Sequence, residues 1–306
     1  MRVALGPLVL ANPIVTASGT FGHGDEVARL GSPHALGAVT TKSVSPFAWA
    51  GNPAPRVHET AAGMLNSVGL QNPGVERWVD DELPALAATG ARVIASIWGH
   101  TVDDYAKAAA VVARAHHATP ALIALEVNVS CPNLEDRSRV FAHSVDATAA
   151  AVGAAVMHAD GLPVFAKLSP NVTDIRDIAR AAMDAGATGL TLVNTLLGLA
   201  IDPETRRARL GAGGGGLSGA AMRPVAVRAV HDVATDRPGT PIIGTGGVTS
   251  AADAVEMLLA GASAVGIGTA IFRNPRAAEQ IARDLARWCA RHGVARVADL
   301  IGGLQT

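Results

Sequence analysis

A thiol, two carboxamides and a hydroxyl lie within the sequence Asn-Val-Ser-Cys-Pro-Asn at positions 128–133. The mostly apolar run 121–127 precedes them and predicts a buried strand that ends at this polar group. Pro132 prevents simple continuation of the strand, and side chains at such strand ends carry the chemistry of α/β barrels. We therefore predict that Cys131 is a functional thiol. The alternative is a small buried hydrophobe, as most free cysteines are and as we expect of Cys289.

The other predicted strands also end in polar side chains, namely Ser18, Lys42, Ser96, Asn128, Lys167, Asn194 and Thr195. Two lysines at strand ends indicate an anionic cofactor and an anionic substrate. Either lysine could instead pair with a neighbouring acid or form a Schiff base. The amides of Asn66, Asn128, Asn133 and Asn194 suit a planar heterocycle that alternates donors and acceptors, although a lone asparagine is more often a turn residue.

Glycines follow the last two predicted strands, as Gly246-Gly247 and as Gly268-Thr269. Backbone N–H groups after the seventh and eighth strands of a barrel commonly converge on a phosphate. Glycine can also serve only to permit a tight turn. Because both pairs stand at the two expected strands, we predict a phosphate site.

Eight short apolar runs alternate with amphipathic, helix-length segments along the whole chain. The predicted strands are residues 14–18, 38–43, 92–97, 121–130, 163–169, 189–195, 241–246 and 263–268. The predicted helices are residues 75–88, 102–117, 144–158, 174–185, 220–233, 251–260 and 275–291. Eight alternating units favour a single (β/α)8 TIM barrel over residues 1–306, with a doubly wound open sheet as the alternative.

Local signals mark several helix ends. Gly90, Gly186 and Gly261 stand where helices stop, and Thr173 and Ser250 stand where N-caps belong.

Three long connections, 45–74, 132–143 and 198–219, follow predicted strands and should form lids or binding walls at the C-terminal face. Residues 211–216 match G-x-G-x-x-G but follow a charged segment rather than a strand, so we interpret them as a flexible loop.

Composition excludes several classes of function. The formal net charge of −1 provides no basic footprint for nucleic acid. Two cysteines argue against a disulfide framework and cannot supply four thiolates for an iron–sulfur cluster. The first ten residues are too short an apolar stretch for a membrane span and lack a signal-peptide pattern, and the ten histidines show no metal-ligand spacing. We expect a cytoplasmic protein without membrane insertion.

With these residues assembled, the chain resembles the class 1 dihydroorotate dehydrogenases, most closely the catalytic subunit of the NAD-linked class 1B enzymes. The resemblance is nearly full length and strong because its motifs are many and ordered. They are Ala-Ser-Gly-Thr-Phe-Gly at 17–22, Thr-Lys-Ser at 41–43, Gly-Asn-Pro-Ala-Pro-Arg at 51–56, the segment 63–74, residues 128–133, Lys-Leu-Ser-Pro-Asn at 167–171, Asn-Thr at 194–195, Gly-Leu-Ser-Gly at 216–219, Gly-Thr-Gly-Gly at 244–247 and Gly-Thr-Ala at 268–270.

The resemblance implies that FMN lies across the barrel mouth with dihydroorotate stacked on it, and that Cys131 is the base at C5 while hydride passes from C6 to flavin N5. It implies substrate binding by Lys42, Asn66, Ser67, Val68, Gly69, Leu70, Asn128, Asn133, Asn194 and Thr195. It implies FMN binding by Ser18, Lys42, Ser43, Ser96, Asn128, Lys167, Val193, Gly219, Gly246, Gly247, Gly268 and Thr269. A nucleophilic role for the thiol is disfavoured, because no histidine stands at a predicted strand end to activate it.

Two departures from the family pattern bear on these expectations. Ser96 stands where relatives commonly carry asparagine, and the segment 134–139 lacks the glycines typical of class 1B. Class 1B subunits pass electrons to a partner with FAD and a 2Fe-2S cluster and then to NAD, which implies a heterotetramer built on a homodimer. Class 1A enzymes are homodimers that use fumarate.

Three other functions compete with this hypothesis. A Schiff-base aldolase barrel would use Lys167 or Lys42 but leave the thiol and the asparagines without a role. A non-catalytic flavoprotein would bind FMN without reacting, and a flavin-dependent pyrimidine reductase would act on uracil rather than orotate.

Overall fold

The computed structural model describes residues 1–130, 132–133 and 139–305. Eight parallel strands form its central sheet, and each lies within one of the eight predicted strands. They are β3 (Ile14–Thr16), β4 (Val39–Thr40), β7 (Val93–Ile97), β8 (Leu122–Asn128), β11 (Val164–Leu168), β12 (Gly189–Leu192), β17 (Ile242–Thr245) and β18 (Ala264–Ile267). Every residue of these strands is buried, which explains why they read as apolar runs without alternation.

The sheet closes on itself, so the fold is the predicted (β/α)8 barrel rather than an open sheet. Neighbouring strands follow the order β3-β18-β17-β12-β11-β8-β7-β4. The two end strands then meet through a parallel bridge between Val15 and Ala38. The backbone N–H of Gly37 also donates to the carbonyl of Ile14 over 2.8 Å.

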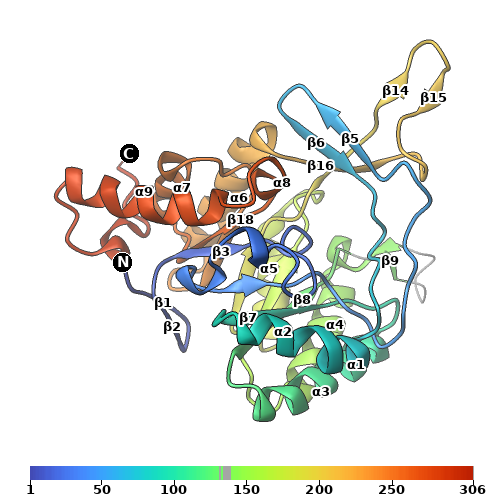
Figure 1. Cartoon of the computed structure of the whole chain (residues 1–306), viewed down its shortest axis with the longest axis horizontal. Coiled ribbons are helices and arrows are strands. Elements are labelled where there is room, and N and C mark those ends of the chain that lie inside the picture. The colour runs from blue at the N-terminus through green and yellow to red at the C-terminus, as the bar shows by residue number, and fades with distance from the viewer. Residues whose placement is uncertain (131, 134–138, 306) are drawn as a thin grey trace.

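Helices between the strands surround the barrel (Figure 1). They are α1 (Val75–Arg77), the π-helical turn η3 (Trp78–Glu82), α2 (Leu83–Ala88), α3 (Val102–Ala118), α4 (Val145–His158), α5 (Ile175–Asp184), α6 (Arg223–Asp236), α7 (Ala251–Leu259), α8 (Ala270–Arg273) and α9 (Ala277–Arg291). Short 3₁₀ turns are η1 (Ala28–Leu30), η2 (Pro33–Ala35), η5 (Phe141–His143), η6 (Ala220–Met222) and η7 (Val297–Leu300). The seven predicted helices are all present, and α8 is an addition. No helix among the described residues is long and apolar enough to cross a membrane.

Most of the predicted helix ends are confirmed. Gly90, Gly186 and Gly261 have φ values of 77°, 97° and 117°, the left-handed conformation that ends a helix. Ser250 caps α7 in a reciprocal capping box with Asp253. The prediction for Thr173 is wrong, because the side chain of the next residue, Asp174, accepts from the Arg176 amide and caps α5.

The long connections contain strands that the sequence did not predict. An antiparallel sheet of order β13-β16-β6-β5 joins β13 (Leu196–Gly198), β16 (Gly215–Ser218), β6 (Gly63–Asn66) and β5 (Val57–Thr60). Two-stranded pairs are β1 (Val3–Leu5) with β2 (Leu8–Leu10), β9 (Pro132–Asn133) with β10 (Arg139–Val140), and β14 (Ile201–Asp202) with β15 (Arg207–Ala208). β5, β6, β14 and β15 project from one side of the molecule (Figure 1).

These strands correct the interpretation of residues 211–216 as a flexible loop. Leu210 and Gly213 form an antiparallel bridge, and β16 begins at Gly215. The segment is therefore part of an ordered wall beside the barrel, and the rejection of a dinucleotide fingerprint is unaffected.

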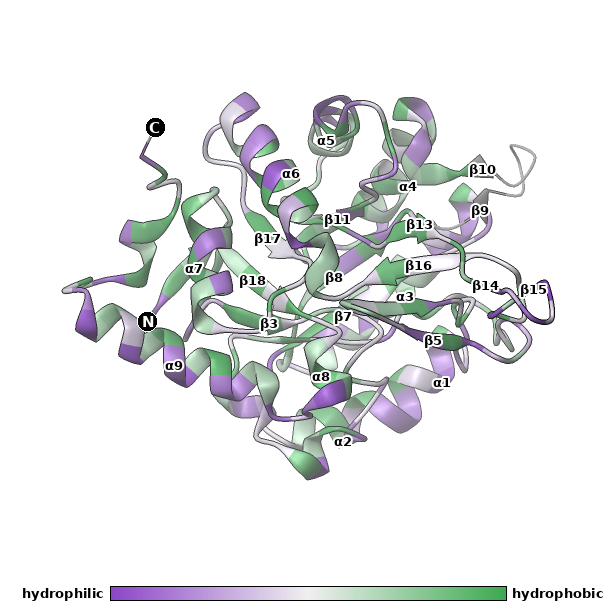
Figure 2. Ribbon diagram, turned by 90° about the horizontal axis from the view of Figure 1, so that it is seen from above, coloured by the Kyte–Doolittle hydropathy of each residue, from purple (hydrophilic) through white to green (hydrophobic). Residues whose placement is uncertain are grey.

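Substitutions in helix α9 can measure how much the packing of the outer helices stabilises the barrel. It alternates apolar and polar residues around its axis (Figure 2), with Leu285 fully buried and Arg283 exposed. We expect Leu285→Ala to lower the free energy of unfolding by about 2–5 kcal/mol, because it removes buried apolar surface and leaves a cavity. Arg283→Ala on the same helix should change it by less than about 0.5 kcal/mol. Denaturant titration of both variants measures the difference, and equal effects would contradict this account of the packing.

Candidate functional site

The predicted polar side chains gather at one rim of the barrel. Ser18 and Lys42 follow β3 and β4, Asn128 ends β8, and Lys167 lies near the end of β11. Asn194 and Thr195 follow β12. All eight strands are parallel, so their carboxyl ends share this rim, which is where barrel enzymes place their sites.

Lys167 reaches across the mouth and is only 5% exposed. Its Nζ donates to the hydroxyl of Ser18 over 2.9 Å, and β3 and β11 stand on opposite sides of the closed sheet. Its Nζ also lies 4.0 Å from the carboxylate of Glu126. The ion pair that the sequence analysis gave as an alternative for this lysine is therefore present, with Glu126, and Lys167 also contacts Ser18 at the mouth.

Asn128 and Asn194 are joined in a hydrogen-bond network on the same rim. The Nδ2 of Asn128 donates to Ser43 Oγ over 3.3 Å, and the Nδ2 of Asn194 donates to Asn128 Oδ1 over 3.4 Å. Ser43 Oγ lies 2.9 Å from Ser96 Oγ. Ser96 is fully buried, so its hydroxyl supports this network from below rather than facing the open mouth. Tyr105 Oη donates to the Asn128 carbonyl over 2.9 Å and fixes the end of β8.

The antiparallel sheet brings the predicted loop from Asn66 to Leu70 to the same site. Asn66 pairs with Gly216 in the register of β6 and β16. A side chain at Gly216 would clash with the hydroxyl of Thr195, so the sheet packs directly on the residues after β12.

Hydrogen bonds to Asn52 then hold the loop itself. Asn52 Nδ2 donates to Ser67 Oγ over 2.8 Å, and the Asn52 amide donates to the carbonyl of Val68 over 3.0 Å. Gly69 and Leu70 follow with φ values of 73° and 61°. The positive φ of Leu70, which is uncommon for a residue with a side chain, indicates that these contacts fix the turn.

The glycine rim lies at the ends of β17 and β18. Within residues 1–130, 132–133 and 139–305, no hydrogen bond to protein is donated by the backbone N–H of Gly246, Gly247, Gly268 or Thr269. A Cβ on Gly247 would lie 2.9 Å from the carbonyl oxygen of Gly219, so the predicted Gly219 belongs to the same rim. Val193 joins β12 to this side, since its amide donates to the Thr245 carbonyl over 2.8 Å. The rim offers unpaired donors to an anion.

Cys131, the predicted base, lies outside the described residues. Asn133 is described through its backbone only, which pairs with Arg139 in β9 and β10. Cys289 is 5% exposed within α9, as expected of a packing residue.

Two titratable groups near the site, the buried Glu126 and the half-buried His23, were missed by sequence reasoning. Glu126 occupies β8 at 2% exposure, and its only signal is a lone acid within an apolar run. His23 follows Gly22, whose carbonyl accepts the Lys42 amide over 2.8 Å. The spacing of His23 from other residues in the sequence does not indicate a functional role.

The surroundings of His23 disfavour its charged form. Burial, and then the charge of Lys42, lower the pKa of His23 to about 4, against an opposing effect of Glu26. Side-chain nitrogen and oxygen atoms of His23, Glu26 and Glu82, which could ligate a metal ion, lie within 4.8 Å of one another. Glu26 already accepts from the amides of His23 and Gly24 over 3.1 and 2.7 Å, so this cluster is organised by local bonds.

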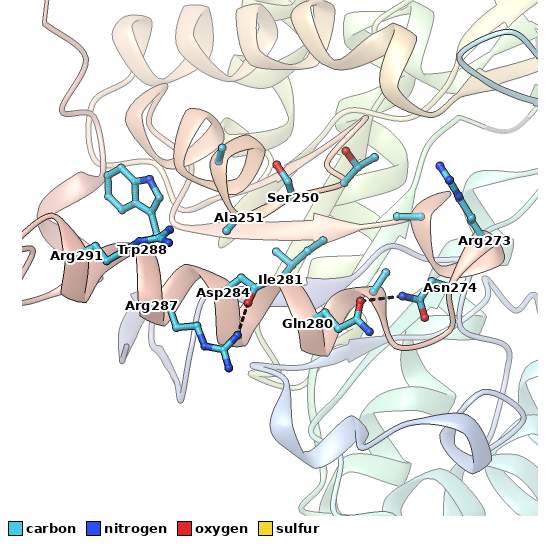
Figure 3. Close-up of a pocket in the computed structure, with 14 residues that line it drawn as sticks. Ser250, Ala251, Arg273, Asn274, Gln280, Ile281, Asp284, Arg287, Trp288 and Arg291 are labelled. Carbon is cyan, nitrogen blue, oxygen red and sulfur yellow. Dashed lines mark hydrogen bonds and ion pairs between the residues drawn. The ribbon is translucent and has the colours of Figure 1, made fainter.

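A separate hollow of about 750 Å³ lies outside the barrel between α7, α8 and α9 (Figure 3). Much of its polar lining is already paired. Asn274 donates to Gln280 over 2.8 Å, and Arg287 pairs with Asp284 over 2.9 Å. No predicted site residue is among the described residues that line it, so the barrel mouth is the better candidate.

A mouth lined by lysines and amides, facing a glycine rim, is typical of (β/α)8-barrel enzymes, which place their sites at the C-terminal face. Comparison with known proteins narrows the class. The profile of the family described as Dihydroorotate dehydrogenase matches residues 2–288. The chain therefore belongs to the dihydroorotate dehydrogenases, a family of oxidoreductases.

Relatives of the same name match along the whole chain. The "Dihydroorotate dehydrogenase B (NAD(+)), catalytic subunit" of Trichlorobacter lovleyi is 46% identical, over 100% of this chain and 98% of its own length. Those of Desulforudis audaxviator and Shouchella clausii are 50% and 44% identical, over 98% and 99% of this chain and 96% and 98% of their own lengths. The predicted resemblance to class 1B catalytic subunits is confirmed.

The lowered pKa of His23 makes stability depend on pH. The unfolded chain binds a proton near the ordinary value of 6.5 and the folded chain only near 4, so stability falls as pH drops from about 6.5 to about 4. We expect His23→Gln, which cannot be protonated, to lose less stability across this window than the wild type. Urea titrations at several pH values measure the difference. Parallel curves for the two proteins would contradict it.

Proposed function

We propose that this chain oxidises (S)-dihydroorotate to orotate in pyrimidine biosynthesis, as an FMN-binding catalytic subunit that passes electrons to NAD through a partner in the cytoplasm. The whole chain, residues 1–306, acts as one FMN-binding domain. The proposal is carried by the match over the full chain to subunits with this name, combined with a mouth that offers amides, lysines and an anion rim.

FMN fits the residues present. The unpaired N–H groups of the glycine rim suit its phosphate. When bound, FMN supplies the hydride acceptor of the reaction. Lys167 would stabilise the negative charge that builds on the reduced ring. We assign FMN binding to Ser18, Lys42, Ser43, Asn128, Lys167, Val193, Gly219, Gly246, Gly247, Gly268 and Thr269. Ser96 would contribute to FMN binding only through Ser43, because its buried hydroxyl does not face the mouth.

The substrate has a carboxylate and a ring with alternating C=O and N–H groups, and the mouth offers partners for both. We assign the carboxylate to Lys42 and the loop of Asn66, Ser67, Val68, Gly69 and Leu70. We assign the ring to Asn128, Asn133, Asn194 and Thr195, whose amides and hydroxyl supply donors and acceptors. The contact between Gly216 and Thr195 supports this grouping, because it brings the loop beside Thr195.

Cys131 is assigned as the base that removes the C5 proton. A cysteine near cations forms its thiolate more readily, and Lys42 and Lys167 supply positive charge at the rim where β8, the strand that precedes Cys131 in the sequence, ends. The segment after Cys131 would exclude water from the proton transfer.

The electron acceptor requires a partner, because two cysteines cannot ligate an iron–sulfur cluster. We propose a partner with FAD and a 2Fe-2S cluster, assembled with a homodimer of this chain into a heterotetramer. A Schiff-base aldolase receives less support, since Lys167 is engaged with Ser18 and Glu126 and the amide network would have no role.

Anaerobic mixing with dihydroorotate tests the proposed function. The purified chain should be yellow, and its flavin absorbance should bleach on addition of dihydroorotate but not of dihydrouracil. Reoxidation should be slow with fumarate and rapid with NAD once the partner subunit is added. A colourless protein would overturn the FMN assignment, and rapid fumarate turnover by the isolated chain would overturn the NAD-linked one.

Cys131→Ala isolates the proton transfer. The variant should retain FMN but lose at least about a hundredfold in turnover, because general-base catalysis contributes roughly that factor or more. Cys289→Ala removes the other thiol at a packing position and should keep turnover close to that of the wild type. Steady-state oxidation of dihydroorotate measures both, and near-normal turnover of Cys131→Ala would exclude the thiol as base.

A further inference from the structure

Glu126 is a buried acid that the proposed mechanism does not use. Among the described residues, only Glu126, Lys167 and Asp253 are charged side chains with less than a tenth of their surface exposed. Asp253 pairs with Arg223 at the N-terminal end of α6. Glu126 instead lies inside the barrel in β8, two residues before Asn128, and therefore points to the same face of the strand.

Both oxygens of the Glu126 carboxylate are occupied from neighbouring strands. Ser96 Oγ donates to Oε1 over 3.1 Å, and Thr191 Oγ1 donates to Oε2 over 3.0 Å. The ammonium of Lys167 lies 4.0 Å from Oε1. Because the two hydroxyls are the donors in these bonds, each uses its single proton on Glu126.

The use of the Ser96 proton on Glu126 also sets the direction of the hydrogen bonds that lead from Ser96 to the mouth. Ser96 has given its proton to Glu126, so in the 2.9 Å contact with Ser43 its oxygen must accept. Ser43 is then the donor in that contact. Its oxygen is left to accept from the Nδ2 of Asn128 over 3.3 Å.

The direction continues to the amides at the mouth. With Nδ2 of Asn128 turned to Ser43, its Oδ1 accepts from the Ser130 amide over 3.1 Å and from Asn194 Nδ2 over 3.4 Å. The Oδ1 of Asn194 then accepts from the Thr195 amide over 2.8 Å. The two ends of a carboxamide have nearly the same shape, so their hydrogen-bond partners decide which end faces a ligand. Here the backbone N–H groups of Ser130 and Thr195 hold the two Oδ1 atoms, and Ser43 holds the Nδ2 of Asn128.

We propose that Glu126 is a positioning residue, which through Ser96 and Ser43 holds the Nδ2 end of the Asn128 carboxamide and so keeps Asn128, and Asn194 bonded to it, in place against the substrate ring. The inference rests on the proposed function, because it assigns these two amides to orotate and dihydroorotate. The network from Glu126 to Asn194 is called the relay below.

Ser96 and Thr191 form a matched pair for testing the relay. Each is buried, and each gives one hydroxyl to one oxygen of the same carboxylate, but only Ser96 connects onward to Ser43. Ser96→Ala and Thr191→Val should therefore both lower the melting temperature. Only Ser96→Ala should weaken orotate binding, by about tenfold or more, because it breaks the connection through Ser43 that holds the Nδ2 of Asn128 for the substrate ring. Thr191→Val should change it by less than about threefold.

The dissociation constant of orotate is measured on the FMN-loaded protein from the change in flavin absorbance, beside a thermal melt of each variant. Equal orotate affinity in Ser96→Ala and Thr191→Val would overturn the inference, because the role of the hydroxyls would then be structural. A wild type that binds no flavin overturns the proposed function and the inference together. A wild-type flavoprotein with an unaffected Ser96→Ala overturns the inference alone.

Glu126→Leu tests the acid itself. It should weaken orotate binding as Ser96→Ala does, and the double variant should be no weaker than Glu126→Leu alone, since both changes cut the same relay. Additive losses in the double variant would overturn the relay. Where Glu126→Leu does not fold, the comparison of Ser96→Ala with Thr191→Val decides the question.

Discussion

Closure of the sheet between β3 and β4 is the contact on which the site depends. β4 is only two residues long, and side chains supplement its short ladder. The Thr40 amide donates to Thr16 Oγ1 over 2.9 Å, and that hydroxyl donates to the Thr40 carbonyl over 3.2 Å. Since Ser18 and Lys42 each follow one of these threonines by two residues, the same contact sets both at the rim. Without it the sheet would be open, and Lys167 could not bond to Ser18 across the mouth.

A closed barrel of eight strands must fill its interior with side chains, and here the layer beneath the mouth is polar. Buried polar groups are tolerated only when they are hydrogen-bonded, and a buried charge requires an opposite charge or several donors. Glu126 satisfies both conditions through Ser96, Thr191 and Lys167. The hydrogen bonds that pair these buried polar groups are thus connected to the hydrogen bonds of the side chains that line the site. The same bonds therefore stabilise the fold and orient the side chains that would bind a ligand.

The parts of this structure that the sequence predicted are those with local physical causes. The eight strands are buried on both faces and so appear as apolar runs, and Ser250 shows its cap within four residues. The pairing of β6 with β16 was missed because it joins glycine-containing segments about 150 residues apart, as between Asn66 and Gly216, where no β-branched residues mark a strand. The polar strand ends were predicted as a group, but Glu126 was not, since a single acid in an apolar run matches no motif. Thr173 was preferred to Asp174 because both are good caps, and only backbone geometry selects between adjacent candidates.

The site separates two kinds of recognition around the closed sheet. In the strand order, β17 and β18 stand opposite β7 and β8, so the glycine rim faces the side that carries Glu126 and Asn128. The rim recognises through backbone N–H groups, whose positions follow from the strand ends themselves. The opposite side recognises through side chains, whose donors and acceptors must be turned correctly before a ligand arrives. The relay helps to turn them, because it ends on the buried side chain of Glu126. Ser96 donates its proton to Glu126, so Ser43 has to donate to Ser96 and its oxygen is left to accept from Asn128.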